Sequence, residues 1–114
     1  MDNNQVNLAA NGKSNSELIM HVVYKVKAGK RDEFIKRVTE AGIIKASKQE
    51  PGNLLYDYYC PIDDNNSVLL VEEWTNTSVQ EAHCRTEHFK RLSEIKKEYI
   101  EEVIIKKYIA SSIL

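Results

Sequence analysis

The sequence predicts a single α+β domain with the element order β-α-β-β-α-β, the ferredoxin-like plan in which helices cover one face of an antiparallel sheet. Segments rich in β-branched and aromatic residues alternate with segments whose apolar residues recur every three to four positions. The length of 114 residues suits one domain with one hydrophobic core.

The first half of the chain predicts one strand and one helix. Residues 18–26, LIMHVVYKV, are dominated by the types that favour strands. A turn at residues 28–30, AGK, precedes a helix predicted over residues 31–48, where the apolar residues fall on one face. The helix should end at residues 50–52, EPG, because proline cannot continue a helix and glycine permits a sharp change of direction.

A hairpin is predicted next. Residues 53–60, NLLYDYYC, and residues 68–74, VLLVEEW, have strand composition, and the turn formers of residues 61–67, PIDDNNS, separate them.

The last part of the chain predicts a two-part helix and a final strand. Helical spacing covers residues 79–84 and resumes over residues 86–99. Thr77 or Ser78 with Glu81 resembles a capping box for the first part. The final strand is expected over residues 103–109, VIIKKYI.

Composition narrows the class of protein. The chain has 16 Lys and Arg against 17 Asp and Glu, a net charge of -1. Proteins that bind nucleic acids usually carry a basic stripe on their surface, so we expect no nucleic-acid partner. No apolar run approaches the roughly 18 residues needed to span a membrane, so we expect no membrane partner. Cys60 and Cys84 form no CxxC motif, and a cytoplasmic location is predicted.

The chain is expected to consist of a flexible N-terminal tail over residues 1–17 and one domain over residues 18–114. The tail is rich in Asn, Gly and Ser and is too polar for a signal peptide.

Three segments together resemble the antibiotic-biosynthesis-monooxygenase domain family: KAGKRDEF at residues 27–34, EPGNLLYDYY at residues 50–59, and EEWTNTSVQEAHCRTEHF at residues 72–89. The resemblance covers roughly residues 18–110. It implies a homodimer, a dimeric α/β barrel whose two sheets pack against each other, with a ligand pocket between sheet and helices. The family includes quinol monooxygenases that use no metal or organic cofactor, haem-degrading oxygenases, and the isomerase of phosphorylated autoinducer-2.

Strand alternation decides which side chains can share that pocket. Glu72 and Trp74 point to one face of their strand, and Glu73 points to the other. By the resemblance, the Trp74 face should meet the helices and the Glu73 face should meet the partner subunit. Tyr24 shares a face with the apolar residues of the first strand. On the second strand one face should carry Leu54, Tyr56 and Tyr58.

His83 and His88 are the candidate catalytic residues, because imidazole is the side chain whose ordinary pKa lies near neutrality. His88 should open a helix, and a helix N-terminus favours a neutral imidazole that can act as a base. The candidate substrate-binding residues are Trp74 as a flat aromatic wall, Tyr56 and Tyr24 as hydroxyl donors, and Glu72 on the same face.

Together with these residues, the family resemblance implies a cofactor-independent monooxygenase that acts with dioxygen on a small hydroquinone-like aromatic. The protein would supply an aromatic pocket and a base for the phenolic proton. No cofactor is expected. No metal is expected either, because the adjacent His83 and Cys84 would point apart on a helix and could not join His88 around an ion.

Two alternatives stay open at this point. An isomerase of a phosphorylated, autoinducer-2-like molecule would use the same histidines and would need cations, for which Arg85, Lys90 and Arg91 are available. A dimer that binds a small molecule without catalysis is the other alternative. Haem degradation fits poorly, because Ser93 and Val22 stand where those relatives have histidine and asparagine.

Overall fold

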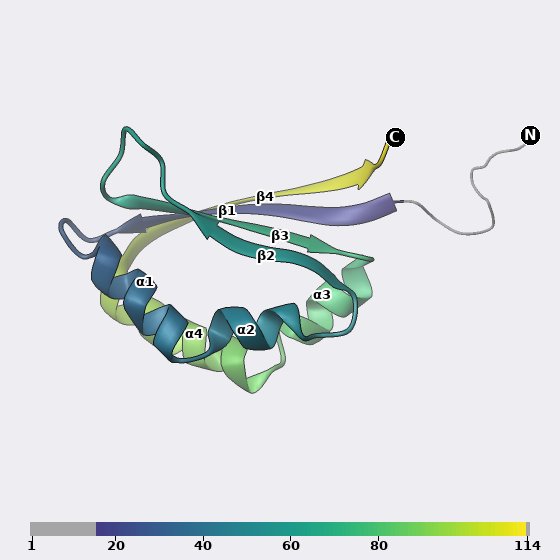
Figure 1. The fold of residues 1–114 in the computed structure, drawn as a ribbon, viewed down its shortest axis with the longest axis horizontal. Helices are drawn as coiled ribbons and strands as arrows, with labels where there is room; N and C mark the ends of the chain where they lie inside the picture. The colour runs from purple at the N-terminus through teal and green to yellow at the C-terminus, as the bar shows by residue number, and fades with distance from the viewer. Residues whose placement is uncertain (1–15, 114) are drawn as a thin grey trace, which may run out of the picture.

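A computed structural model describes residues 16–113 as one antiparallel sheet with four helices on one of its faces (Figure 1). This confirms the ferredoxin-like prediction. The elements are β1 (Ser16–Val26), α1 (Arg31–Glu40), α2 (Ile43–Lys48), β2 (Asn53–Tyr59), β3 (Ser67–Trp74), α3 (Thr77–His83), α4 (Glu87–Tyr99) and β4 (Ile100–Ser111).

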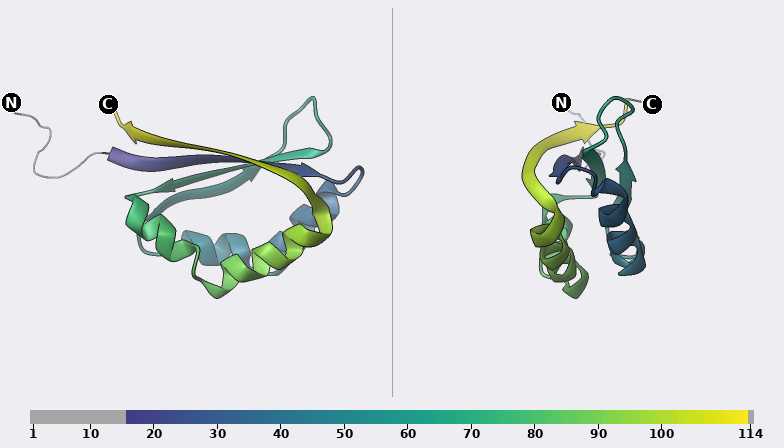
Figure 2. Two further views of the ribbon diagram at one scale, coloured as in Figure 1. Left: turned by 180° about the vertical axis from the view of Figure 1, so that it is seen from behind. Right: turned by 90° about the vertical axis from the view of Figure 1, so that its left-hand side faces the viewer.

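The strand order is β2-β3-β1-β4, so β1 and β3 occupy the centre of the sheet. The helices form two rows beneath it: α1 and α2 lie under one side and α3 and α4 under the other (Figure 2). The opposite face of the sheet carries no helix. We call these the helix-facing and the outer face.

The hydrophobic core lies between the helix-facing side of the sheet and the two rows of helices. Alternate residues are buried along β1 and along β3 from Val68 onwards, and their neighbours are not, as a sheet covered on one face requires. Trp74, Tyr56 and Phe34 are the largest side chains that the core encloses completely. The expectation that Glu72 and Trp74 share the helix-facing side is therefore confirmed.

The single helix expected over residues 31–48 is divided into α1 and α2. Gly42 adopts a φ of 75°, a left-handed conformation that interrupts the helical hydrogen bonding and that glycine tolerates best. The apolar spacing continues across the interruption, so periodicity alone did not reveal it. The final strand is also longer than predicted, because it follows α4 directly at Ile100.

Two further details differ from the predictions. The N-cap of α3 is Asn76, whose side-chain oxygen accepts a hydrogen bond from the Val79 amide at 2.9 Å, so the capping box at Thr77 or Ser78 is wrong. Leu54 is exposed and does not share the buried environment of Tyr56, because the pairing of β2 with β3 is irregular between Asn53 and Leu55.

Residues 1–15 of the predicted tail lie outside the described residues, and Ser16 and Glu17 belong to β1. Among residues 16–113, no helix is long and apolar enough to cross a membrane.

Candidate active site

The structure joins the two predicted histidines through a carboxylate that sequence reasoning did not single out. Nδ1 of His83 lies 2.5 Å from Oε2 of Glu50, and Nε2 of His88 lies 2.6 Å from the same oxygen. A carboxylate oxygen can accept two hydrogen bonds, so each imidazole donates one ring N–H to Glu50. The His83 ring is 1% exposed, whereas part of the His88 side chain reaches the surface.

The turn between α2 and β2 places Glu50. Gly52 adopts a φ of 84°, and a Cβ atom at this position would lie 2.8 Å from both the Thr75 Oγ1 and a Val79 methyl group. The Gly52 carbonyl also accepts a hydrogen bond from the Thr75 amide at 2.9 Å. Only glycine permits this close approach between the turn and the start of α3, which holds Glu50 beside the histidines.

The break between α3 and α4 brings the two histidines together. Thr86 caps α4 by accepting a hydrogen bond from the Phe89 amide at 3.1 Å. Its hydroxyl also donates to the carbonyl of His83 at 2.8 Å. One side chain therefore fixes the last residue of α3 relative to the first turn of α4, where His88 lies.

Aromatic rings surround the buried His83. Its ring centroid lies 4.9 Å from that of Trp74, 5.3 Å from that of Phe89 and 5.6 Å from that of Tyr56. The His88 ring follows at 5.7 Å. Of the predicted substrate-binding residues, Trp74 and Tyr56 thus contact the histidine cluster directly.

Glu72 is a second buried carboxyl group beside this cluster. It is 5% exposed, and its Oε1 accepts a hydrogen bond from the Trp74 indole Nε1 at 3.0 Å. Burial raises the pKa of Glu72, an effect that the Trp74 hydrogen bond and the nearby His83 and Lys96 partly offset. The hydrogen bond also fixes the plane of the indole against His83.

Tyr24 lies further along the same face, away from the histidines. Its ring packs against Phe34 at 5.6 Å and Tyr58 at 6.4 Å. The buried hydroxyls of Tyr56 and Tyr58 have no hydrogen-bond partner among the described residues. Burial raises the pKa of Tyr24, Tyr56 and Tyr58, so all three hydroxyls stay protonated donors at neutral pH.

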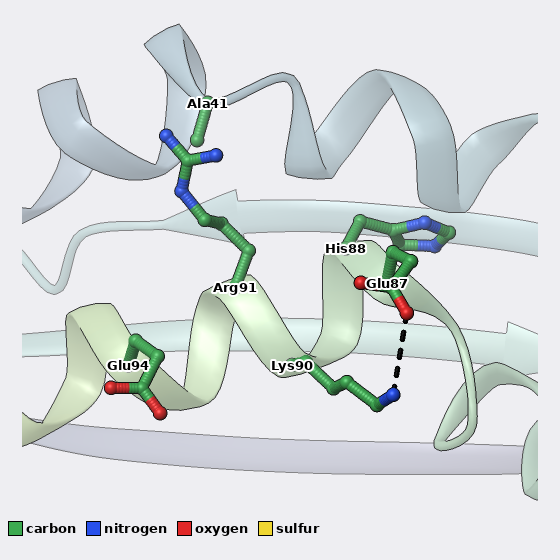
Figure 3. Close-up of a pocket in the computed structure, with 6 residues that line it drawn as sticks. All are labelled: Ala41, Glu87, His88, Lys90, Arg91 and Glu94. Carbon is green, nitrogen blue, oxygen red and sulfur yellow. Dashed lines mark hydrogen bonds and ion pairs between the residues drawn. The ribbon is translucent and has the colours of Figure 1, made fainter.

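A surface pocket of about 420 Å³ opens beside the exposed edge of His88. Its lining consists of Ala41, Glu87, His88, Lys90, Arg91 and Glu94. In Figure 3 the Arg91 side chain reaches towards Ala41, while Lys90 pairs with Glu87 at 3.3 Å. The pocket lies between α4 and Ala41 at the end of α1, and its lining residues are mostly charged, so it is a different environment from the aromatic cluster around His83.

Glu50, His83 and His88 also form a possible set of metal ligands. Their ligand atoms lie within 4.8 Å of one another, and two imidazoles with one carboxylate suit a divalent transition metal. An ion would have to displace the two ring protons that now bind Glu50. This set differs from the His83, Cys84 and His88 combination considered from the sequence, and the expectation of a metal-free protein stays a prediction.

Comparison with known proteins places this chain in a family. The family model described as "Antibiotic biosynthesis monooxygenase" matches residues 18–95. The chain belongs to this family, as its motifs predicted.

Individual relatives agree with that assignment. The Bacillus subtilis protein called "Putative monooxygenase YcnE" is 28% identical over 72 residues, which cover 63% of this chain and 74% of that protein. The crystal structure of PA3566 from Pseudomonas aeruginosa superposes with a TM-score of 0.79 and 22% identity, covering 89% of this chain and 100% of the other. The structure of a "Putative antibiotic biosynthesis monooxygenase" from Nitrosomonas europaea superposes with a TM-score of 0.74 and 24% sequence identity. The superposition covers 89% of this chain and 94% of the other.

Proposed function

We propose that this protein is a cofactor-independent monooxygenase that acts with dioxygen on a small, hydroquinone-like aromatic. The observation that carries the proposal is the buried His83 ring, held on one side by Glu50 and surrounded on the other by Trp74, Tyr56 and Phe89. A base inside an aromatic environment is what such a reaction requires of a protein.

The Glu50 hydrogen bond selects the base. When Nδ1 of a neutral His83 donates to Glu50, the lone pair lies on Nε2, on the opposite edge of the ring. That nitrogen can take the phenolic proton of a substrate. General-base assistance of this kind contributes about two to four orders of magnitude in rate.

The remaining chemistry comes from the substrate. A deprotonated hydroquinone is electron-rich enough to pass an electron to dioxygen directly. The overall reaction converts a hydroquinone and one dioxygen into a hydroxyquinone and one water, so one oxygen atom enters the ring and the substrate supplies the electrons that reduce the other. We assign Trp74 as the wall that orients the ring and Tyr56 as a hydroxyl donor to a substrate oxygen.

His88 connects this base to solvent. It shares the Glu50 oxygen with His83 and also lines the surface pocket. The Glu50 carboxylate therefore stabilises the imidazolium that forms when Nε2 of His83 takes the phenolic proton, and that proton passes to the oxygen atom that is reduced to water, which restores the base for the next turnover.

The isomerase alternative has weaker support. The three cations that the sequence offers for it do not line the site around His83: Arg85 and Arg91 are exposed, and Lys90 pairs with Glu87. Aromatic rings rather than cations surround His83. The arrangement also fits a dimer that only binds an aromatic molecule, and turnover distinguishes that alternative from the oxygenase.

We also propose that the protein is a homodimer formed through the outer face of the sheet. No helix covers this face, and Ile104 and Tyr108 of β4 are exposed on it. The neighbouring Val23, Leu69 and Val71 are only half-buried. A second copy would cover this apolar surface. Both cysteines are free and exposed, which suits a reducing compartment such as the cytoplasm.

Oxygen uptake with a panel of dihydroxynaphthalenes tests the oxygenase proposal. We expect saturable uptake above autoxidation by protein shown to contain no metal or flavin. His83→Gln should abolish it, Trp74→Phe should weaken it, and His21→Gln, which changes an exposed histidine of the outer face, should leave it unchanged. Equal uptake by wild type and His83→Gln, or uptake only after metal is added, would refute the proposal.

A further inference from the structure

Within the described part of the chain, Lys96 is the one lysine of α4 whose ammonium group makes no direct ion pair, although the Glu72 carboxyl group is near enough to affect its pKa. Lys90 pairs with Glu87 and Lys97 with Glu94, both on the exposed side of the helix. Among residues 16–113, Lys96 has neither an ion pair nor a hydrogen bond. Its ammonium nitrogen instead lies 5.5 Å from the ring centroid of Tyr24 and 5.8 Å from that of Phe89.

Cation–π contacts alone do not replace the water that this ammonium has lost. Lys96 is half-buried, and burial lowers the pKa of its ammonium group while Glu72 opposes that effect. The Glu72 carboxyl group accepts from the Trp74 indole through Oε1, and it makes no ion pair within 4 Å with Lys96. The Lys96 ammonium group therefore keeps hydrogen-bond donors that no described residue uses, and an anionic oxygen of a ligand can accept from them.

The surroundings of Lys96 contain further polar atoms with no partner. The hydroxyls of Tyr56 and Tyr58, both buried on the helix-facing side, make no hydrogen bond among the described residues. Buried polar atoms in native proteins are nearly always bonded, to protein or to something bound. The Tyr58 ring also packs on the Tyr24 ring that Lys96 contacts, at 6.4 Å between centroids, so the Tyr58 hydroxyl and the Lys96 ammonium group belong to the same aromatic cluster and indicate a place for a ligand with oxygen atoms.

Solvent reaches Lys96 along the edge of α4 that faces β4. Phe89, Ser93 and Lys96 follow one another at spacings of four and three residues and are all half-buried, so they form one stripe of the helix. Across from this stripe, Val103 and Ile105 of β4 are paired with the helix-facing Tyr24 and Val22 yet are exposed. The edge therefore gives access from solvent to Lys96 and its aromatic neighbours.

We propose that Lys96 binds an anionic oxygen of the aromatic ligand, so that the substrate class is an aromatic carboxylate or an acidic phenol whose ring packs against Phe89. This inference rests on the proposed function for its choice of an aromatic ligand. It assigns Lys96 a binding role that is separate from the proton transfer at His83. A ligand that carries its charge opposite the reacting hydroxyl would be oriented at both ends.

A matched pair of probes tests the charge preference without any turnover. Isothermal titration calorimetry measures the binding of 2-naphthoate and of 2-naphthamide to the protein. The two ligands have nearly the same shape, but only naphthoate carries a negative charge. We expect the wild type to bind naphthoate about tenfold more tightly, as one charge-assisted contact provides. Lys96→Met should remove that preference and Lys96→Arg should keep much of it. Lys97→Met, which changes the exposed neighbouring lysine, should leave it intact.

The outcomes separate the two proposals. An unchanged preference in Lys96→Met, equal weakening of both probes in that variant, or no binding of either probe to wild type up to about 1 mM would overturn the role of Lys96. If the preference for naphthoate depends on Lys96 but no hydroquinone supports oxygen uptake, the oxygenase proposal fails and the anion site stands. If oxygen uptake depends on His83 but the protein shows no preference for naphthoate, the anion site fails and the oxygenase proposal stands.

Discussion

Glu72 and Glu73 are neighbours on β3, yet they belong to two different environments. Glu72 lies on the helix-facing side, 5% exposed, with its carboxyl bound to the Trp74 indole. Glu73 lies on the outer face, where it is half-buried among uncovered strand residues. Alternation along a strand alone produces this difference.

The comparison shows how one sheet can carry two tasks. The helix-facing side holds charged and polar groups that a hydrophobic core does not need: the buried His83, Glu72 and tyrosine hydroxyls, and the half-buried Glu50 and Lys96. The outer face is mainly apolar but uncovered. Buried polar groups weaken a fold unless they are paired, so their concentration on one face indicates chemistry. Exposed apolar groups weaken solubility unless they are covered, so their concentration on the other face indicates a partner.

The sharpest test of the helix-facing side is Glu50→Gln. The amide has the size of the carboxylate but cannot accept hydrogen bonds from both His83 and His88 at one oxygen, because one of its ends is a donor. We expect oxygen uptake to fall about 10³-fold, within the range of general-base assistance, with a small change in melting temperature. Steady-state rates for Glu50→Gln and the exposed control Glu81→Gln measure this effect. A fall of less than tenfold would remove Glu50 from the mechanism.

The outer face is tested by introducing a charge at its centre. Val71 pairs with His21 on one side and Asp57 on the other. Val71→Lys should raise the dissociation constant of the dimer about 100-fold, because a charge buried in an apolar interface is costly. Light scattering across a concentration series gives the mass, and Ile62→Lys, a fully exposed residue of the β2–β3 connection, is the control. If the wild type is a monomer, the proposal of a dimer through the outer face is wrong.

Much of the fold was predictable, because apolar residues recur with the spacing of a strand or of a helix in most elements. The helix-facing pattern of β1 and β3 followed from alternation, and the hairpin followed from its turn residues. What periodicity could not predict was local. Gly42 interrupts a helix whose apolar spacing continues, and the irregular pairing near Leu54 depends on the partner strand. Such features depend on backbone conformation and tertiary contact rather than on composition.

The candidate site was predicted in part. His83, His88, Trp74 and Tyr56 do come together. From the sequence, Glu50 belongs to the predicted helix stop and to the EPGNLLYDYY segment of the family resemblance, but neither pattern assigns it to the site. Its distance of 33 residues from His83 along the chain hid the contact. Nothing in the sequence distinguishes Lys96 from the exposed Lys97 beside it, and only the structure shows that Lys96 turns inward over Tyr24 and Phe89.

The buried charge of Glu72 should make stability depend on pH. Because burial raises the folded-state pKa of Glu72 above its unfolded value, the folded protein holds this proton more tightly. The stabilisation is complete below the unfolded pKa, near pH 4, and is lost as pH rises through the folded value. Glu72→Gln keeps an acceptor for Trp74 but cannot ionise. The melting temperature of this variant, relative to that of the wild type, should therefore rise as the pH increases from about 4 to 8. Glu73→Gln should show a smaller trend, and equal trends would contradict the contrast between the two glutamates.

The smallest expected effect is a difference in activity between two N-cap variants that lose the same stability. Asn76 and Thr86 are both N-caps, of α3 and α4, and replacing either with alanine should cost about 1 kcal/mol in unfolding free energy. Thr86 also donates to the carbonyl of His83, whereas the Asn76 side chain accepts only from Val79. Thr86→Ala should therefore lower oxygen uptake several-fold, and Asn76→Ala should lower it little at the same loss of stability. Chemical denaturation and rates measured on the same two proteins make the comparison, and equal rates would mean that the junction between α3 and α4 positions His83 without help from the Thr86 hydroxyl.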